Sequence, residues 1–215
     1  MDKNLFVIVD GNALVHRAYH AYPLNLKTSK GELVNAVYGF TRLLLKLATD
    51  LSPRFLAIAF DRPEPTFRHL EYVGYKAHRP KMDQELAGQL ERLRQLVDAY
   101  GIRYFEMAGF EADDVIGTLA VLAKEIDRGL NICIITGDMD ALQLVDDRTY
   151  VLVPVKGLSS TKLWGVAQIK EHYGFGPKEI VDFKALRGDP SDDIPGVKGI
   201  GEKTAKNLIK KCCEL

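Results

Sequence analysis

The sequence near the N-terminus reads Leu5-Phe-Val-Ile-Val-Asp10-Gly11, a continuous apolar run that ends in a carboxylate and a glycine. A short run of this kind is typical of a strand that is buried on both faces, as in a parallel sheet. Residues 54–61 and 131–138 repeat the pattern, because each apolar run there also leads into an aspartate. The chain therefore contains several strands that end at a carboxylate.

Helical patterns separate these runs. Asn12 can cap a helix that continues to about residue 22, and apolar residues at helical spacing predict helices over about 31–50 and 86–101. Short strands are expected at 102–105 and 150–155. Strands that alternate with helices predict an α/β fold, in which a twisted parallel sheet is flanked by helices.

Acidic side chains follow the predicted strands. The segment Phe110-Glu-Ala-Asp-Asp-Val-Ile-Gly117 places three carboxylates in front of an apolar helical pattern, which taken alone indicates only a capped helix. In an open parallel sheet, however, the carboxyl ends of the strands share the edge where ligands bind. We therefore expect the carboxylates after the strands to meet: Asp10, Asp61, Glu111 and Asp138.

Converging carboxylates form a like-charge pocket that is stable only around cations. Oxygen ligands without His or Cys suit hard divalent ions such as Mg²⁺ or Mn²⁺. Two such ions about 4 Å apart can activate a water and stabilise the leaving oxygen in phosphodiester cleavage. The sequence has no Gly-x-Ser-x-Gly and no phosphate-loop Gly-Lys-Ser/Thr, so metal-activated water is the simplest chemistry available.

Two segments favour binding of phosphate. Residues 62–82 are rich in Arg, Lys, His, Tyr and Pro, and a loop of this length is usually functional or mobile. After Gly157 the chain changes to helices with Gly/Pro turns. There, Gly196-Val-Lys-Gly-Ile-Gly201 precedes a lysine-rich helix, and such glycines let backbone N–H groups approach a phosphate.

The composition limits partners and compartment. The charges of the 29 basic and 29 acidic residues cancel, so a nucleic acid must bind at a local basic patch. Apolar runs are far short of a membrane span, and the N-terminus lacks a signal-peptide pattern. The three cysteines form neither a disulfide framework nor a zinc spacing. We expect a reduced, cytoplasmic compartment and no membrane partner.

Two other functions remain open at this point. Asp10 could be the nucleophile of an aspartyl-phosphate phosphatase, although those enzymes usually carry a second Asp where this chain has Asn12. The chain could also be a module that recognises branched DNA without catalysis.

Several motifs together resemble one family. They are Val9-Asp10-Gly-Asn with Arg17, Phe60-Asp61, Tyr75-Lys76-x-x-Arg79, Glu111-Ala-Asp113-Asp114, Thr136-Gly-Asp138-x-Asp140, and the run from Gly188 to Gly201. Through essentially the whole chain the sequence is similar to bacterial 5′→3′ exonucleases, kin of flap endonucleases, and among them to the N-terminal domain of DNA polymerase I. The resemblance implies a PIN-like or resolvase-like α/β fold and a metal-dependent nuclease acting at 5′ flaps and nicks in replication and repair.

The resemblance also assigns residues. One Mg²⁺ or Mn²⁺ would be held by Asp10, Asp61, Glu111 and Asp113, and a second by Asp138, Asp140, Asp189 and Asp192, with Asp113 serving both and Asp114 as an extra carboxylate. Lys76 and Arg79, in a helical arch over about 62–95, would grip the scissile phosphate and join Asp113 in catalysis. DNA contacts are expected from Arg17, Tyr75 and Lys81, and Tyr72 and Tyr75 can stack on unpaired bases.

The resemblance divides the chain into a nuclease domain (1–160) and a shortened helix–hairpin–helix subdomain (161–215). The hairpin would grip duplex DNA, with a bound K⁺, through Gly196, Lys198, Gly199, Gly201, Lys203 and Lys206. The expected partner is DNA with a 5′ flap, nick or 5′ overhang, or an RNA primer–DNA hybrid, with a DNA polymerase as a further partner. The expected protein is a monomer at the bacterial nucleoid. Asp193 departs from the family, which commonly has Asn there.

Overall fold

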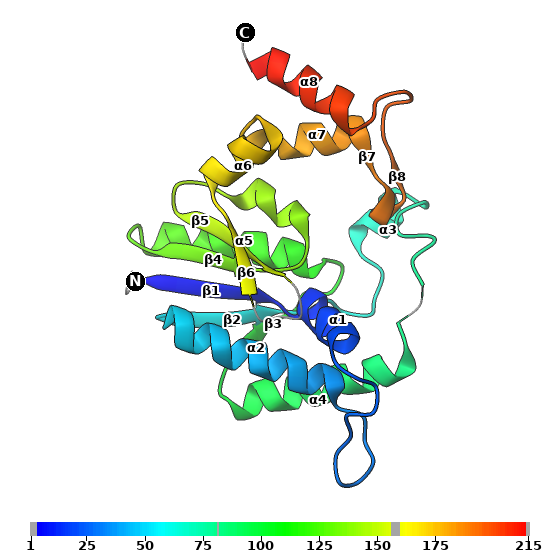
Figure 1. The fold of residues 1–215 in the computed structure, drawn as a ribbon, viewed down its shortest axis with the longest axis vertical. Helices are drawn as coiled ribbons and strands as arrows, with labels where there is room; N and C mark the ends of the chain where they lie inside the picture. Colours follow the sequence, from blue (N-terminus) through cyan, green and yellow to red (C-terminus); the bar gives the residue numbers. More distant parts are fainter. Residues whose placement is uncertain (1–3, 81, 156–159, 214–215) are drawn as a thin grey trace.

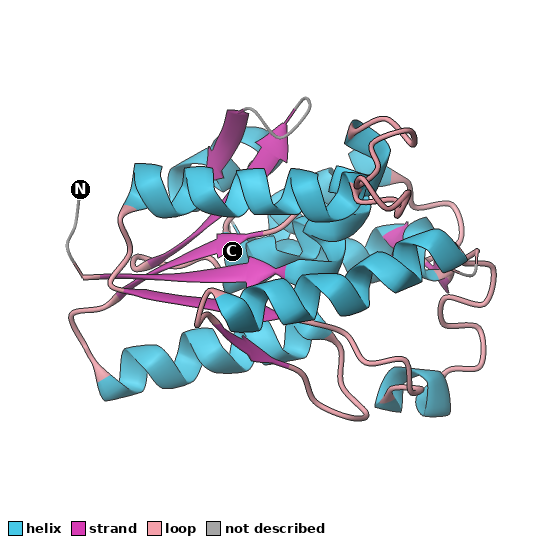
Figure 2. Cartoon of the chain, turned by 90° about the horizontal axis from the view of Figure 1, so that it is seen from below, coloured by secondary structure: helices cyan, strands magenta, loops and turns pink. Residues whose placement is uncertain are grey.

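The computed structural model describes residues 4–80, 82–155 and 160–213. Its centre is a six-stranded sheet in the order β3-β2-β1-β4-β5-β6 (Figures 1 and 2). The parallel strands are β1 (Leu5–Asp10), β2 (Phe55–Ala59), β3 (Arg103–Phe105), β4 (Asn131–Ile135) and β5 (Thr149–Val155). The predicted parallel α/β fold is confirmed. The sequence patterns missed β6 (Ser160–Trp164), an antiparallel edge strand that crosses the domain boundary expected at 160/161.

Helices cover both faces of the sheet (Figure 2). On one face lie α1 (Gly11–Ala21), α2 (Asn35–Leu51) and α4 (Gln84–Ala99); on the other lie α5 (Ala112–Ile126), α6 (Val166–Tyr173), α7 (Ile180–Arg187) and α8 (Glu202–Cys213). Strand β1 supplies both cores, because Val7 and Val9 face one and Phe6 and Ile8 the other. A continuous apolar run is what this two-sided burial requires.

The sheet order reverses between β1 and β4. From β1 the chain passes to β2 on one side and reaches β4 later on the other, which opens a crevice at the carboxyl ends of these two strands. Helix α1 starts in this crevice, directly at Gly11. A Cβ there would lie 2.3 Å from the Phe60 ring, so glycine is needed for α1 to begin so close to β2.

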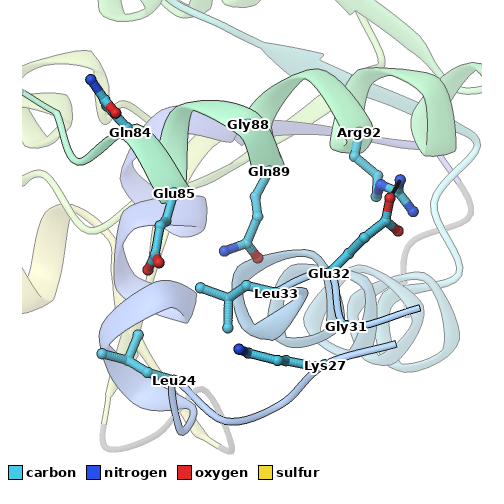
Figure 3. A pocket seen from close by; sticks show the side chains of 10 residues that line it. All are labelled: Leu24, Lys27, Gly31, Glu32, Leu33, Gln84, Glu85, Gly88, Gln89 and Arg92. Atoms are coloured by element: carbon cyan, nitrogen blue, oxygen red, sulfur yellow. Dashed lines mark hydrogen bonds and ion pairs between the residues drawn. The ribbon is translucent and has the colours of Figure 1, made fainter. Parts of the chain in front are cut away.

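Helix α2 begins at Asn35, later than the apolar spacing predicts, because residues 27–33 form a hairpin closed by a bridge from Lys27 to Leu33. The buried Gln89 of α4 accepts hydrogen bonds from the N–H groups of Ala36 (2.8 Å) and Val37 (3.4 Å). Gln89 therefore replaces the missing side-chain cap of α2. It also lines a pocket of about 380 Å³ between the hairpin and α4 (Figure 3). The residues that line this pocket include none of the predicted metal ligands.

Short elements complete the fold around the carboxyl edge of the sheet. They are α3 (Phe67–Glu71), β7 (Gly188–Asp189), β8 (Ile194–Pro195) and the 3₁₀ turns η1 (Met139–Leu144), η2 (Pro177–Glu179) and η3 (Pro190–Asp192). Strands β7 and β8 lie beside the segment that carries α3 (Figure 1). Within the described part of the chain, no helix is long and apolar enough to cross a membrane.

Candidate functional site at the carboxyl edge of the sheet

Asp10 is fixed at the end of β1 by two neighbouring elements. Its Oδ1 accepts a hydrogen bond from the N–H of Ala13 (3.0 Å), which makes Asp10 the N-cap of α1. Its Oδ2 accepts from the Thr136 hydroxyl (2.6 Å), and the same hydroxyl accepts from the N–H of Asp138 (2.9 Å). Thr136 therefore ties the Asp10 carboxylate, after β1, to the backbone of Asp138, after β4.

Asp61 follows β2 and is held in the same way. Its Oδ1 accepts from the N–H of Ala112 (2.7 Å), at the first turn of α5, and its own N–H donates to the Asn12 side chain (3.1 Å). Asp113 lies next along α5, in the first turn, where a helix favours negative charge. Repulsion from Asp10 and Asp61 raises the pKa of Asp113, so these three carboxylates converge as expected.

These carboxylates repel one another in a partly dehydrated pocket. Burial raises the pKa of Asp113 to about 8, and repulsion adds to this from Asp10, Asp138, Asp61 and Glu111. Burial likewise raises the pKa of Asp10 to about 6, and it raises the pKa of Asp61. Such shifts are what converging carboxylates produce in the absence of a counterion. A set of oxygen donors with this need for positive charge fits a hard divalent cation.

A second group lies beside the first. Asp140, Asp189 and Asp192 each offer one carboxylate oxygen, and these three atoms lie within 4.8 Å of one another. The Lys184 ammonium is hydrogen-bonded to Asp140 and lies 2.6 Å from Asp189 Oδ2. Three of the four residues predicted to hold a second cation are therefore together. Asp138, predicted as the fourth, lies outside these three and raises the pKa of Asp10 and Asp113 by repulsion, so its role as a ligand stays a prediction.

Asp114 does not fit the predicted role of a metal ligand. The Arg68 guanidinium donates to both of its oxygens, over 2.7 and 2.8 Å, and Asp114 Oδ2 also accepts from the N–H of Glu111 (2.9 Å). Burial alone would raise the pKa of Asp114, but these hydrogen bonds outweigh it and the pKa lies below its usual value. Asp114 is thus an ion-pair partner and a capping residue of α5.

Glu111 is covered by the segment of residues 67–80, which we call the strap. The Tyr75 hydroxyl donates to Glu111 Oε2 (2.8 Å), and the Lys76 ammonium donates to Oε1 (2.9 Å). The predicted stacking of Tyr75 on DNA bases is not compatible with this geometry, because its side chain is buried. Tyr72 is 43% exposed, so its ring is the one available for stacking.

The strap is also attached to residues 192–193. The N–H of Lys76 donates to the Asp192 carbonyl (3.0 Å), and Arg79 Nη2 lies 3.7 Å from Asp192 Oδ1. The Asp193 carboxylate accepts from the N–H of His78 (2.9 Å) and lies 3.0 Å from its ring Nδ1. Contrary to the helical arch expected here, residues 73–78 form turns, and Lys76 has a left-handed φ of 52°.

The glycine hairpin lies between α7 and α8, as predicted. Gly199 has a φ of 86°, which only glycine adopts without strain, and the Gly201 carbonyl accepts from the N–H of Ala205. A Cβ on Gly196 would lie 2.3 Å from the Arg187 carbonyl carbon, so this glycine is required for packing against β7. Lys198 and Lys203 are exposed.

The remaining predicted DNA contacts differ in their surroundings. Lys206 pairs with Glu202 (2.8 Å) and lies over the Tyr173 ring, so it is less available than Lys198 or Lys203. A Cβ added to Gly137 would be 4.0 Å from Arg17 Nη1, which places Arg17 next to the loop that carries Asp138. Lys81 lies outside the described residues.

Sequence reasoning missed three residues that organise the site and assigned a fourth, Asn12, the wrong role. Asn12 was expected to cap α1, but Asp10 is the N-cap, and Asn12 accepts from the N–H of Asp61. Thr136 and Asn12 lay inside the motifs that carried the resemblance, so their position was a usable signal for a structural role. Arg68 and Lys184 had no such signal. Each reaches its partner only through the fold, since Arg68 lies 46 residues from Asp114 and Lys184 lies 44 residues from Asp140.

The fold and the site define a class of protein: an α/β protein whose carboxylate cluster at the sheet edge can hold cations beneath a basic strap. The chain belongs to the 5′-3′ exonuclease family. The family's N-terminal resolvase-like domain matches residues 5–174, and its C-terminal SAM fold matches residues 175–215.

Named relatives agree with this membership. DNA polymerase I of Bacillus subtilis is 43% identical over 210 residues, and that of Mycobacterium bovis is 45% identical over 208 residues. These matches cover 98% and 96% of this chain but only 24% and 23% of the relatives. The chain therefore spans about a quarter of the length of the curated relatives it matches.

Solved structures share the fold. The T5 D15 protein crystallised with metal ions has a TM-score of 0.73 at 22% identity, covering 96% of this chain and 74% of that one. Flap endonuclease-1 from Methanococcus jannaschii has a TM-score of 0.58 at 19% identity, with 98% and 72% covered. At these identities the likeness concerns the fold alone.

Proposed function

We propose that this chain is a structure-selective 5′ nuclease, which hydrolyses DNA phosphodiester bonds with two divalent cations, Mg²⁺ or Mn²⁺. One observation carries the proposal. Carboxylates that follow β1, β2 and β4 and the carboxylates of α5 meet at one sheet edge, directly beside a second group from η1, β7 and η3. Membership of the 5′-3′ exonuclease family supports the reaction class.

The donor set indicates which residues would hold the cations. Asp10, Asp61 and Asp113 form the first group, with Glu111 beside them, and Asp140, Asp189 and Asp192 form the second, with Asp138 as its fourth proposed ligand. When bound, the cations supply a hydroxide at neutral pH and neutralise charge on the reacting phosphate. Asp114 is left out of this assignment because Arg68 occupies both of its oxygens.

Positive side chains would position the scissile phosphate. Lys76 and Arg79 lie in the strap beside Glu111 and Asp192, and Arg17 lies beside the loop after β4. In the structure, Lys76 is paired with Glu111, so it exchanges this carboxylate for a phosphate when DNA binds. Charge-assisted bonds of this kind stabilise the developing negative charge of phosphoryl transfer.

The substrate is proposed to be DNA with a 5′ flap, a nick or a 5′ overhang, or an RNA primer on DNA. The exposed Lys198 and Lys203 flank the glycine hairpin, and contacts of lysine with phosphate fix register without reading sequence. The exposed ring of Tyr72 can stack on an unpaired base. A K⁺ ion at the hairpin, which would bridge its backbone to phosphate, belongs to the same proposal.

The wider setting is also a proposal. The curated relatives are DNA polymerases of bacteria, so we propose a polymerase as the partner in primer and flap removal, in the cytoplasm at the nucleoid. We propose that the chain acts as a monomer, with residues 1–160 as the nuclease domain and residues 161–215 as the part that grips duplex DNA.

One observation favours a second candidate, a branched-DNA-binding module without catalysis. Lys76 and Lys184 already neutralise carboxylates of both groups. If these pairs persisted with DNA bound, Glu111 would not be free to bind the first cation, and the second cation would be excluded.

Cleavage of a 5′-labelled flap separates the two candidates. The substrate is compared with single-stranded and blunt duplex DNA, each with Mg²⁺ and with chelator. We expect Mg²⁺-dependent cutting near the flap junction. Tight binding of the flap without cutting would favour the binding module, and neither binding nor cutting would contradict both.

A further inference from the structure

A lysine lies inside the second carboxylate group. Lys184, in the last turn of α7, places its ammonium 2.6 Å from Asp189 Oδ2 and in hydrogen-bond contact with Asp140. These are two of the three carboxylates whose oxygens lie within 4.8 Å of one another. The Lys184 side chain is only 25% exposed, and that of Asp189 only 9%. The ammonium is therefore held between the carboxylates rather than on the surface.

The first group is held in a different way. Asp10 accepts from the Thr136 hydroxyl and a backbone N–H, and Asp61 accepts from a backbone N–H, so neutral donors fix these aspartates. Glu111, beside them, is paired with Lys76 of the strap. At Asp189, a backbone N–H and the hydroxyl of Ser191 hold Oδ1, while the lysine holds Oδ2. The two groups therefore differ in their need for an added positive charge.

An ammonium and a divalent cation cannot occupy the same space between Asp140 and Asp189. Even if the two charges stood side by side, the ammonium and the divalent cation would repel each other strongly, because the dielectric constant in a protein is far lower than in water. A metal ion can therefore bind between these carboxylates only after the lysine side chain has turned away.

We propose that Lys184 is a positioning residue that controls the second cation. Its ammonium keeps Asp140 and Asp189 together before metal binds, and it must be displaced when the cation enters. The second site consequently fills after the first and with lower affinity. This inference rests on the proposed two-cation nuclease function and adds a residue that sets the order of loading.

The test is a titration of the whole chain with Mn²⁺, in which electron paramagnetic resonance counts free and bound ions without DNA. For the unsubstituted protein we expect one tight site and one weak site. Lys184→Met keeps an apolar stem of similar length and removes the charge. It should strengthen the weak site by about tenfold or more, because the competing charge is gone.

Three further variants serve as controls. Lys184→Gln repeats the loss of charge with a polar side chain, in case the methionine variant does not fold. Lys178→Met removes the same charge from an exposed side chain in η2, just before α7, and should leave both affinities unchanged. Asp140→Asn should abolish the weak site and so identify it.

The outcomes separate this inference from the proposed function. If the weak site has the same or lower affinity in both charge-free Lys184 variants as in Lys178→Met, the role of Lys184 is wrong, whatever the cleavage activity. If the unsubstituted chain binds no second Mn²⁺ and cuts no flap, the two-cation nuclease function itself is wrong.

Discussion

The Tyr75 hydroxyl donates a 2.8 Å hydrogen bond to Glu111, and this contact joins the strap to the first turn of α5. The same hydroxyl lies 3.3 Å from Asp192 Oδ2, so one buried tyrosine bridges the two carboxylate groups. The ring of Tyr75 rests against His69 on one side, with the Lys76 ammonium 4.8 Å from its centre. The strap is therefore packed into the site by an apolar ring and a polar end.

Replacing Tyr75 tests this bridge. Tyr75→Phe keeps the ring but leaves a buried oxygen of Glu111 without one donor, and hydrogen bonds to charged groups contribute about 1.5–3 kcal/mol. We expect a loss of that order in the free energy of unfolding, measured by urea denaturation. Tyr72→Phe is the control, because the Tyr72 hydroxyl makes only a 3.5 Å contact on the surface. An equal loss in both variants would contradict the bridging role of Tyr75.

Asp113 makes the stability of the metal-free protein depend on pH. Its pKa is about 8 in the folded state and close to 3.8 in the unfolded chain, so the folded state binds more protons between these values. Stability in the presence of chelator should therefore fall as pH rises from about 4 to about 8, by on the order of a few kcal/mol.

Asp113→Asn should remove most of that pH dependence. The variant should be more stable than the unsubstituted protein at pH 8 and equally stable near pH 4, as measured by thermal unfolding with chelator. Asp127→Asn is a suitable control, because the hydrogen bond from Gly129 lowers the pKa of Asp127 and that variant should gain nothing at pH 8. If Asp113→Asn left the dependence of stability on pH unchanged, the Asp113 carboxyl would not be the source of that dependence.

Asp114 and Asp113 are neighbours in sequence with different expected roles. Asp114→Asn should leave the number of bound Mn²⁺ ions unchanged, because Arg68 engages both oxygens of Asp114. It should still lower stability, since Arg68 loses the carboxylate that accepts two of its hydrogen bonds. Asp113→Asn should weaken Mn²⁺ binding at the first group. Calorimetric titration of both variants measures the number and affinity of bound Mn²⁺ ions. Loss of a bound ion in Asp114→Asn would show that Asp114 is a metal ligand.

Asp193 anchors the strap through His78. Asp193→Asn retains one acceptor but loses the charge that faces the His78 ring, so the strap should open more often. Faster hydrogen exchange of the amides between 74 and 79 is expected, while the strands of the sheet exchange as before. Identical exchange in the variant would show that the carboxylate charge does not hold the strap.

The sequence predicted the scaffold well because the way a segment is buried determines the spacing of its apolar residues. A strand such as β1, which is buried on both faces, must be apolar at every position, and its end marks the sheet edge. The carboxylates after the strands could be predicted to converge for the same reason. Strand β6 was missed because it is an exposed edge strand with only Trp164 buried.

The finer arrangement of the site depended on side chains that meet only in the fold. Nothing in the local sequence distinguishes Asp113, which faces other carboxylates, from Asp114, which faces Arg68. The turn conformation of the strap could not be predicted from its local sequence either. Its backbone is fixed by contacts with residues 192–193, more than a hundred positions later in the chain.

The central claim is that the carboxylates at this edge perform DNA cleavage, and Asp138 tests it most directly. Asp138 is exposed at the edge, where its charge acts on Asp10 and Asp113 and its Oδ1 accepts a 2.8 Å hydrogen bond from the N–H of Asp140 at the start of η1. Because only this one exposed cap is lost, Asp138→Ala should leave the fold intact. The decisive measurement is the single-turnover cleavage rate of a 5′-flap substrate in Mg²⁺, with binding of the same DNA measured in parallel. We expect cleavage to be abolished and binding to be largely retained. Full cleavage by Asp138→Ala would contradict the account.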